Sequence, residues 1–295
     1  MTADQTAVVT TLTAPHKARA IPIRRKAYTI AGWFLTGFAL LLLSSAMVWI
    51  LATVFVRGVG ALSPALFTTT TQGIAGGLLN AIEGTAVLSL GALLIAVPFG
   101  LAAGIYASEY GHGYWAPTVR FLSDMLVGVP SIVLGYVGYV TMVDWLGWNF
   151  CVAAGSIAIS IICLPYICRT TEFALQQVPS DLREAAFALG ASEGRVIFGI
   201  CLPAALPAIL TGILLALAIS VGETAPLLYT AGWSDYLWNG QLTNSPIGYL
   251  TYAIWTFINE PFAAAHQLAY AAAFLVTTFV LVVHIISRFV FDRRK

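Results

Sequence analysis

The stretch Pro179–Pro203, PSDLREAAFALGASEGRVIFGICLP, is a polar interruption between two long apolar segments. Pro179 ends the preceding helix and Ser180 can cap a new one, so we expect a helix to begin here. Gly190 is expected to end that helix, because glycine adopts the left-handed conformation without steric cost. A second helical turn is expected from Ser192. The stretch therefore predicts a helix-turn-helix between two membrane spans.

The first of these helices has a narrow face of small and apolar side chains. Spacing at i, i+3, i+4 and i+7 places four residues on it: Leu182, Ala185, Ala186 and Leu189. Arg183, Glu184 and Phe187 lie elsewhere around the helix. Asp181 and Glu184 put negative charge near the positive end of the helix.

The composition of the chain requires a lipid environment. Hydrophobic residues make up 59% of the sequence and charged residues only 9%, with a mean hydropathy of +0.86. Soluble domains carry about 25% charged residues, so a chain of this length could not cover a globular surface with so few. The net charge of +1 gives no reason to expect a nucleic-acid partner.

The apolar segments predict an all-α integral membrane protein with six transmembrane helices, since about 20 apolar residues cross the hydrocarbon core. We expect spans at about residues 30–56, 81–107, 125–145, 149–168, 203–229 and 267–289. Residues 1–27 are expected to form a cytoplasmic tail and residues 28–295 the transmembrane domain, with a loop at 179–202. The aromatic stretch 232–265 suits the membrane interface and a short helix lying along it.

Basic residues indicate the orientation of the chain in the membrane. Six spans put both termini on one side, and that side receives Lys17, Arg19, Arg24, Arg25, Lys26, Arg120, Arg169, Arg183, Arg195, Arg288, Arg293, Arg294 and Lys295. Only Arg57 falls on the opposite side. The positive-inside rule then places both termini and the 179–202 loop in the cytoplasm.

Catalytic and metal-binding motifs are missing from the sequence. Cys151, Cys163, Cys168 and Cys201 show no C-x-x-C spacing and are expected to be buried free thiols. The four histidines, at positions 16, 112, 266 and 284, define no metal site. No Gly-x-x-x-x-Gly-Lys phosphate loop occurs, so we expect no ATP hydrolysis, no cofactor and no enzymatic activity in this chain.

Charged residues inside or at the ends of spans are candidate functional residues, because a charge there is costly and usually faces a cavity or a partner. Arg169 and Glu172 are three residues apart and can pair on one helix face, and Glu223 with Thr224 falls inside the fifth span. Arginine, threonine and a carboxylate together suit a tetrahedral oxyanion that carries a proton. Two alternatives stay open: Arg169 reaches the headgroups by snorkelling, and Glu223 bonds to the backbone of a neighbouring span.

The polar loop resembles a known family. Glu184-Ala185-Ala186, Gly190 and, after nine intervening residues, Ile200-x-Leu202-Pro203 are similar to the EAA loop of MetI-like permease subunits in binding-protein-dependent ABC importers. The resemblance implies that the loop forms a cytoplasmic coupling helix in a groove of the ATPase subunit. The residues expected to couple are Arg183, Glu184, Ala185, Ala186, Leu189 and Gly190.

Four further motifs resemble the A-type permease subunits of Pst phosphate importers within that family. They are Gly222-Glu223-Thr224-Ala225-Pro226-Leu227, Arg169-Thr170-Thr171-Glu172, Gly128-Val129-Pro130-Ser131-Ile132-Val133, and Gly76-Gly77 followed by Ala81-Ile82-x-Gly84-Thr85. The resemblance implies a subunit of the bacterial cytoplasmic (inner) membrane that works by alternating access. It implies four partners: a second, PstC-like permease, a PstB-like ATPase dimer, a PstS-like periplasmic phosphate-binding protein, and phosphate itself.

One position departs from that pattern, since Ile219 stands where these permeases usually carry arginine. A permease for another oxyanion, such as phosphonate, sulfate or molybdate, is therefore the main alternative. A secondary transporter would explain the spans and Glu223, but it leaves the spaced EAA loop without a purpose. A membrane-embedded enzyme would need a cluster of His, Asp or Cys that the sequence does not supply. Small residues, Gly91, Ala92, Ala96, Gly100, Ala103 and Gly104, are expected to permit close helix contact.

Overall fold

The computed structural model describes residues 23–111 and 113–292. The chain divides into two compact units, residues 1–52 and 53–295, each described by itself. In the first unit, α2 (Ile23–Ala61) begins at Ile23, so the predicted tail is helical over its last residues. Residues 1–22 of that tail, with His16, Lys17 and Arg19, lie outside the described residues, as do His112 and Arg293–Lys295. The side chains of α2 described up to residue 52 are all exposed.

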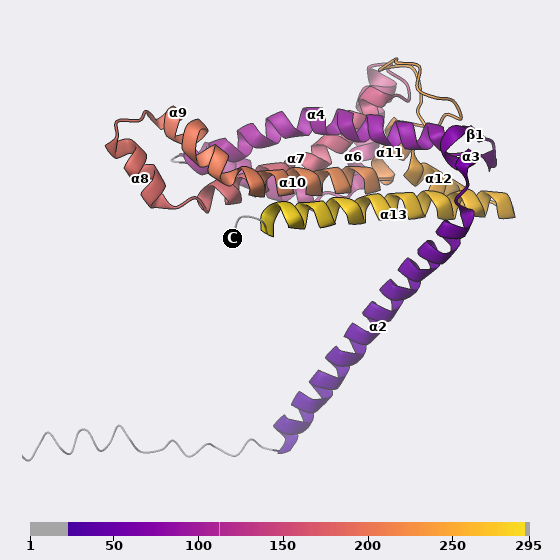
Figure 1. Ribbon diagram of the computed structural model, residues 1–295, viewed down its shortest axis with the longest axis horizontal. Helices are drawn as coiled ribbons and strands as arrows, with labels where there is room; N and C mark the ends of the chain where they lie inside the picture. Colours follow the sequence, from indigo (N-terminus) through magenta and orange to yellow (C-terminus); the bar gives the residue numbers. More distant parts are fainter. Residues whose placement is uncertain (1–22, 112, 293–295) are drawn as a thin grey trace, which may run out of the picture. The chain divides into compact units, whose positions relative to one another are not determined.

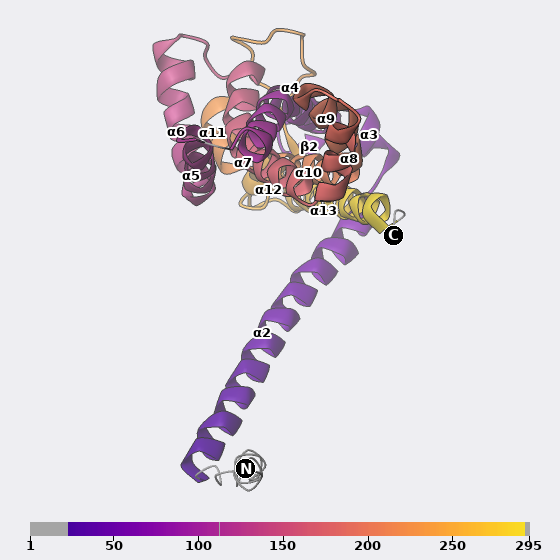
Figure 2. The ribbon, with the colours of Figure 1, turned by 90° about the vertical axis from the view of Figure 1, so that its left-hand side faces the viewer.

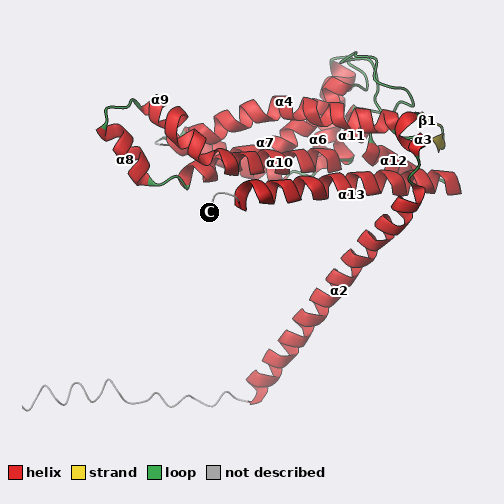
Figure 3. Ribbon diagram, viewed as in Figure 1, coloured by secondary structure: helices red, strands yellow, loops and turns green. Residues whose placement is uncertain are grey.

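The second unit is almost entirely helical (Figure 3). After the end of α2 come α3 (Pro64–Thr68) and a small antiparallel pair, β1 (Thr71–Gln72) and β2 (Ala75–Gly76), in which Thr71 faces Gly76. The remaining elements are α4 (Leu79–Glu109), α5 (Trp115–Gly128), α6 (Ser131–Gly138), the π-helix η1 (Tyr139–Trp145), α7 (Val152–Gln176), α8 (Ser180–Ala188), α9 (Glu193–Val196), the π-helix η2 (Ile197–Cys201), α10 (Leu202–Gly222), α11 (Ala225–Thr230), α12 (Leu250–Phe257) and α13 (Ala263–Asp292).

Helices α4, α7 and α10 form the centre of this unit, with α5 and α6 on one side and α13 on the other (Figure 2). Small residues allow this packing, as the sequence predicts. Ala92 and Ala96 are fully buried, and a Cβ added at Gly100 would lie 2.8 Å from the side chain of Ile167 on α7. Burial of Ala, Leu and Ile side chains between these helices forms the main core.

The third predicted span is not one straight helix. Helix α5 ends at Gly128, and the chain bends by 97° before α6 begins at Ser131. Pro130 explains the break, because it has no N–H to donate to the preceding turn and restricts the residue before it. Five helices of the described chain are long and apolar enough to cross a membrane, or six if the bent pair counts as one span.

Other boundaries also differ from the expected spans. Helix α7 covers 152–176 where we expected 149–168, because its polar last turns pack against α4 and α5. The predicted fifth span, 203–229, is interrupted at Glu223 and Thr224 between α10 and α11. Helices α4 and α13 extend the expected 81–107 and 267–289 at both ends. The short helix expected in the 232–265 stretch is α12, while its position at a membrane interface stays a prediction.

Helices α8 and α9 lie at one end of the second unit, and α3, β1 and α12 lie at the opposite end (Figure 1). We call the first the coupling end, defined by α8, α9 and the last turns of α4 and α7. The second is the outer end, defined by α3, β1, β2, α12 and the loop 231–249. All four cysteines are buried and free, as expected.

Candidate functional site

Helix α8 begins at Ser180 and ends as the sequence predicts. Gly190 has a φ of +78°, and the N–H groups of Gly190 and Ala191 donate to the carbonyls of Phe187 and Ala186 at 2.9 and 3.1 Å. These two bonds form a Schellman cap, which requires a left-handed residue and so favours glycine. The expected Ser180 cap is wrong: the helix starts at Ser180 itself, without a side-chain cap. The second helix, α9, follows from Glu193.

The predicted apolar face of α8 is only partly buried against the rest of the chain. Ala186 is 5% exposed and packs with Leu175 and Val178 at the end of α7. Leu189, by contrast, is 89% exposed, and Leu182 is also exposed. A helix with bulky apolar side chains left in the open presents a surface for another protein.

Arg183 fixes α8 to the ends of two long helices. Its Nη2 donates to Glu109 Oε1 at 3.0 Å and to the carbonyl of Leu175 at 2.8 Å, and its Nη1 also pairs with Glu109. The Glu109 side chain is 5% exposed. The hydrogen bond from Arg183 to Glu109 raises the pKa of Arg183. The arginine therefore keeps its charge and its bidentate contact with the carboxylate. Arg183 therefore ties α8 to α4 and α7.

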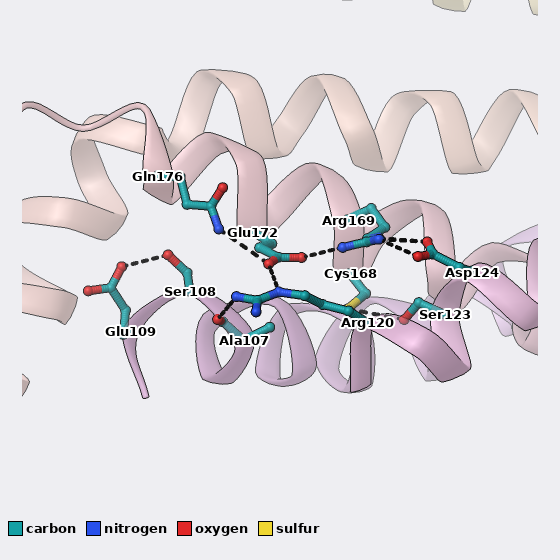
Figure 4. Close-up of polar contacts among 10 residues, drawn as sticks. All are labelled: Ala107, Ser108, Glu109, Arg120, Ser123, Asp124, Cys168, Arg169, Glu172 and Gln176. Atoms are coloured by element: carbon teal, nitrogen blue, oxygen red, sulfur yellow. Dashed lines mark hydrogen bonds and ion pairs between the residues drawn. The ribbon is translucent and has the colours of Figure 1, made fainter. Parts of the chain in front are cut away.

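A buried carboxylate links α5 and α7 at the same end (Figure 4). Glu172 is 2% exposed and accepts hydrogen bonds from Arg120, from Arg169 at 2.9 Å and from Gln176 at 3.2 Å. The predicted pairing of Arg169 with Glu172 is confirmed. Because three donors converge on Glu172, its buried charge is fully compensated.

The far ends of this network were not predicted. Arg169 also donates to both carboxylate oxygens of Asp124, at 2.7 and 2.6 Å, and Arg120 donates to the carbonyl of Ala107 at 2.7 Å (Figure 4). Arg120 and Asp124 both lie on α5. The available signal was their spacing of four residues, which places both on one helix face, as the spacing of three does for Arg169 and Glu172 on α7.

Glu223 and Thr224 occupy the break between α10 and α11, not the interior of a helix as expected. Pro226 in the first turn of α11 accounts for the break. The Glu223 carbonyl accepts a hydrogen bond of 2.7 Å from Thr251 Oγ1. Its carboxylate is half-buried and has no hydrogen bond or ion pair to another described residue. Glu223 is thus the transport candidate whose charge is free to meet a ligand.

The four transport candidates fall at two levels of the bundle. Thr170, next to Arg169, packs against Gly212 of α10. The residues of α10 from Gly212 to Glu223 span about 16 Å at about 1.5 Å per residue. The structure therefore brings Arg169 and Glu172 together near the coupling end and leaves Glu223 and Thr224 about 16 Å away along α10.

A profile of the family described as "Binding-protein-dependent transport system inner membrane component" matches residues 96–295. The chain is 44% identical over 272 residues to "Phosphate transport system permease protein PstA 2" of Mycobacterium bovis, covering 92% of this chain and 90% of that relative. It is 43% identical to PstA of Yersinia pestis, covering 84% of this chain and 85% of that relative.

The chain belongs to the PstA family of permeases. This PstA-family chain is a multi-pass component of the inner membrane that works with the other components of an ABC transporter, and it is not the catalytic one. Solved structures share its fold. A chain of the MetNI methionine ABC transporter aligns with a TM-score of 0.56 at 19% identity, over 78% of this chain and all of that one. A chain of a bacterial alginate ABC importer aligns with a TM-score of 0.57 at 15% identity, over 91% of this chain and all of that one.

Proposed function

We propose that this permease imports inorganic phosphate together with a second, PstC-like permease, a PstB-like ATPase dimer and a PstS-like periplasmic phosphate-binding protein. The substrate assignment rests on the names of relatives that match more than four-fifths of the chain at over 40% identity. The exposed face of α8 carries the coupling assignment. Family membership leaves a secondary transporter without support, while phosphonate, sulfate or molybdate are the competing substrates.

Coupling to the ATPase is proposed to run through α8. Leu189 and Glu184 are both exposed. The Glu184 side chain makes no hydrogen bond or ion pair to another described residue. The forked contact of Arg183 with Glu109 and the carbonyl of Leu175 transmits a displacement of α8 directly to α4 and α7. Closure of the ATPase dimer would then change the path from cytoplasm-open to periplasm-open. This role covers Arg183, Glu184, Ala185, Ala186, Leu189 and Gly190.

The phosphate path is proposed to pass Glu223 and Thr224 first and Arg169 and Glu172 second. At the first level, the unpaired carboxylate of Glu223 can accept a hydrogen bond from a protonated phosphate, and Thr224 offers a hydroxyl. At the second level, the guanidinium of Arg169 is already held by Asp124 and Glu172. Phosphate there would compete with Asp124, the exposed partner, since Glu172 is buried.

Ile219 affects the charge available along this path, because it lies on α10 one helical turn before Glu223. An arginine at that position would be at i, i+4 to Glu223 and could pair with it. With isoleucine in place, Glu223 is left without that partner, and positive charge for the anion at the level of Glu223 has to come from the second permease.

The proposed orientation puts both termini and the coupling end in the cytoplasm. The last turn of α13 lies on the side of α8 and away from α3 and β1, in agreement with this orientation (Figure 1). The basic residues Arg120, Arg169, Arg183 and Arg195 lie on α5, α7, α8 and α9, at or near the coupling end, as the positive-inside rule requires.

The test is uptake of labelled phosphate by the complete transporter in vesicles, with sulfate, phosphonate and molybdate as competitors. Glu184→Lys reverses an exposed charge on α8 and is expected to abolish ATP-driven uptake without lowering the melting temperature. Asp144→Lys makes a similar change at an exposed residue of η1 and serves as the matched control. Normal uptake in the Glu184→Lys transporter would refute the coupling role, and preference for another oxyanion would refute the substrate.

A further inference from the structure

Arg57 is the exception to the charge distribution of the chain, since every other lysine and arginine is expected on the cytoplasmic side. It lies in the last turns of α2, and both it and its contacts belong to the second unit. Its Nη1 donates to the hydroxyl of Tyr270 on α13 at 3.0 Å, and its guanidinium carbon lies 5.0 Å from the centre of the Tyr270 ring. Both contacts are neutral. None of the ion pairs in residues 23–111 and 113–292 includes Arg57.

Arg57 is exposed, and neither of its two contacts supplies a negative charge. The guanidinium has five N–H donors, and its one hydrogen bond to a described residue uses a single donor. The remaining fork matches the geometry of a phosphate group, which accepts two parallel hydrogen bonds from arginine. Arg57 therefore has the charge and the donors for an anion that the described chain does not provide.

A cavity of about 350 Å³ lies beside Arg57, between the end of α2 and the start of α13. Gly60, Ala61 and Ala263 leave the space open, while His266 and Gln267 add polar side chains to its wall. No aspartate or glutamate occurs among the described residues that line it. The cavity is therefore rich in donors and free of competing negative charge, which suits a phosphate group and not a cation.

The helix junction beneath the cavity is rigid. A Cβ added at Gly58 would lie 2.8 Å from the carbonyl of Tyr270, so glycine is required for this close approach. Phe55 packs edge-on against Phe274 with ring centres 5.0 Å apart. These contacts hold the backbone of α2 next to α13 and keep Arg57 and His266 at the same cavity.

We propose that this cavity, lined by Arg57, His266, Gln267 and Tyr270, binds a phosphate group at the outer surface of the membrane. The phosphodiester of an anionic phospholipid is the favoured source, because Val56, next to Arg57, is an apolar residue 75% exposed and offers a surface for acyl chains. Inorganic phosphate is the other source of the same chemistry. The site uses the orientation given above but does not depend on which substrate is transported.

The experiment uses the complete transporter in phosphatidylcholine nanodiscs, with and without phosphatidylglycerol. Thermal unfolding gives the stabilisation by lipid, and native mass spectrometry counts the phosphatidylglycerol molecules retained. We expect phosphatidylglycerol to raise the melting temperature, and Arg57→Gln to weaken its apparent affinity about five- to tenfold. Gln267→Leu keeps the contact of Arg57 with Tyr270 and should weaken retention to a smaller extent. Arg195→Gln removes the same charge at an exposed residue of α9 and is the matched control.

A second titration identifies the source of the phosphate group. Inorganic phosphate is added to the phosphatidylcholine nanodiscs without phosphatidylglycerol, and the unfolding is repeated. A stabilisation that Arg57→Gln removes would support the site and assign it to free phosphate; no effect, with the lipid effect intact, would assign it to phospholipid. Equal responses of the wild type and Arg57→Gln in both titrations would overturn the proposal, whatever the outcome of the uptake assay.

Discussion

The coupling end and the outer end of the bundle are held together by different chemistry. In the described part of the chain, all four ion pairs lie towards the coupling end, on α4, α5, α7 and α8. At the outer end the loop 231–249 is fastened by uncharged groups and by single carboxylates that accept N–H bonds. Asn80 there joins Thr71 to the carbonyl of Ser234, and Trp233 stacks on Tyr252 at 4.6 Å.

This difference bears on how each end would respond to a displacement of α8. The carboxylates of Glu172 and Glu109 are 2% and 5% exposed, so their arginine pairs are costly to separate and join the helices firmly. Only the Asp124 end of this network is exposed. Neutral hydrogen bonds in a buried site are costly to break, because the freed groups find no water. We propose that the helix ends joined by these ion pairs move together with α8, while the outer end keeps its shape.

The largest effect is expected from Glu172→Ala. This substitution removes the 2%-exposed carboxylate that holds Arg120 and Arg169, and leaves two arginines facing each other. Removing one partner of a buried ion pair destabilises by about 3–5 kcal/mol. Chemical denaturation of the purified chain in detergent measures it, with the exposed Glu184→Ala as control. A loss as small as that of the control would mean that Glu172 is solvated.

Asn80→Ala probes the outer end and should be next in size. Asn80 is 1% exposed, accepts from the backbone N–H of Thr71 at 3.0 Å and donates to the carbonyl of Ser234 at 2.8 Å. Loss of these bonds leaves buried groups unpaired and costs about 2–3 kcal/mol. The loss should be the same at low and high salt. A strong salt dependence would contradict the neutral character given to this end.

Arg183→Lys keeps the charge of the coupling tie and removes its fork. Lysine cannot hold Glu109 and the carbonyl of Leu175 together as Arg183 does, so we expect a loss of about 1–2 kcal/mol. Uptake should fall further than stability, because the link from α8 to α4 is loosened. Comparing uptake with ATP hydrolysis in the same vesicles measures this; tightly coupled transport by the variant would argue against the tie.

The smallest effect is expected from Asp124→Asn, because the Asp124 side chain is 60% exposed. An exposed ion pair contributes less than about 1 kcal/mol, and salt screens it. Unfolding at low and high ionic strength should show a small difference from wild type that disappears with salt. A large, salt-independent loss would place Asp124 among the buried groups of the network.

Sequence patterns anticipated much of this molecule and failed at identifiable places. The start of α8, the left-handed Gly190, the Arg169–Glu172 pair and the packing role of Gly100 were all predicted. The 97° bend at Pro130 and the break before Pro226 were not predicted, although both prolines are in the sequence. A run of apolar residues does not show whether the span that it forms is straight or broken.

By itself, the sequence determined the membrane environment, the approximate positions of most long helices, the polar loop at 179–202 and the family. These follow from composition and from residues a few positions apart, where helical periodicity and capping act. Only the tertiary structure decided the partners of the charges: Arg120 meets Glu172 and Arg183 meets Glu109 across 52 and 74 residues of chain. Such pairs depend on which helix ends lie side by side, and that is fixed by packing of the whole bundle.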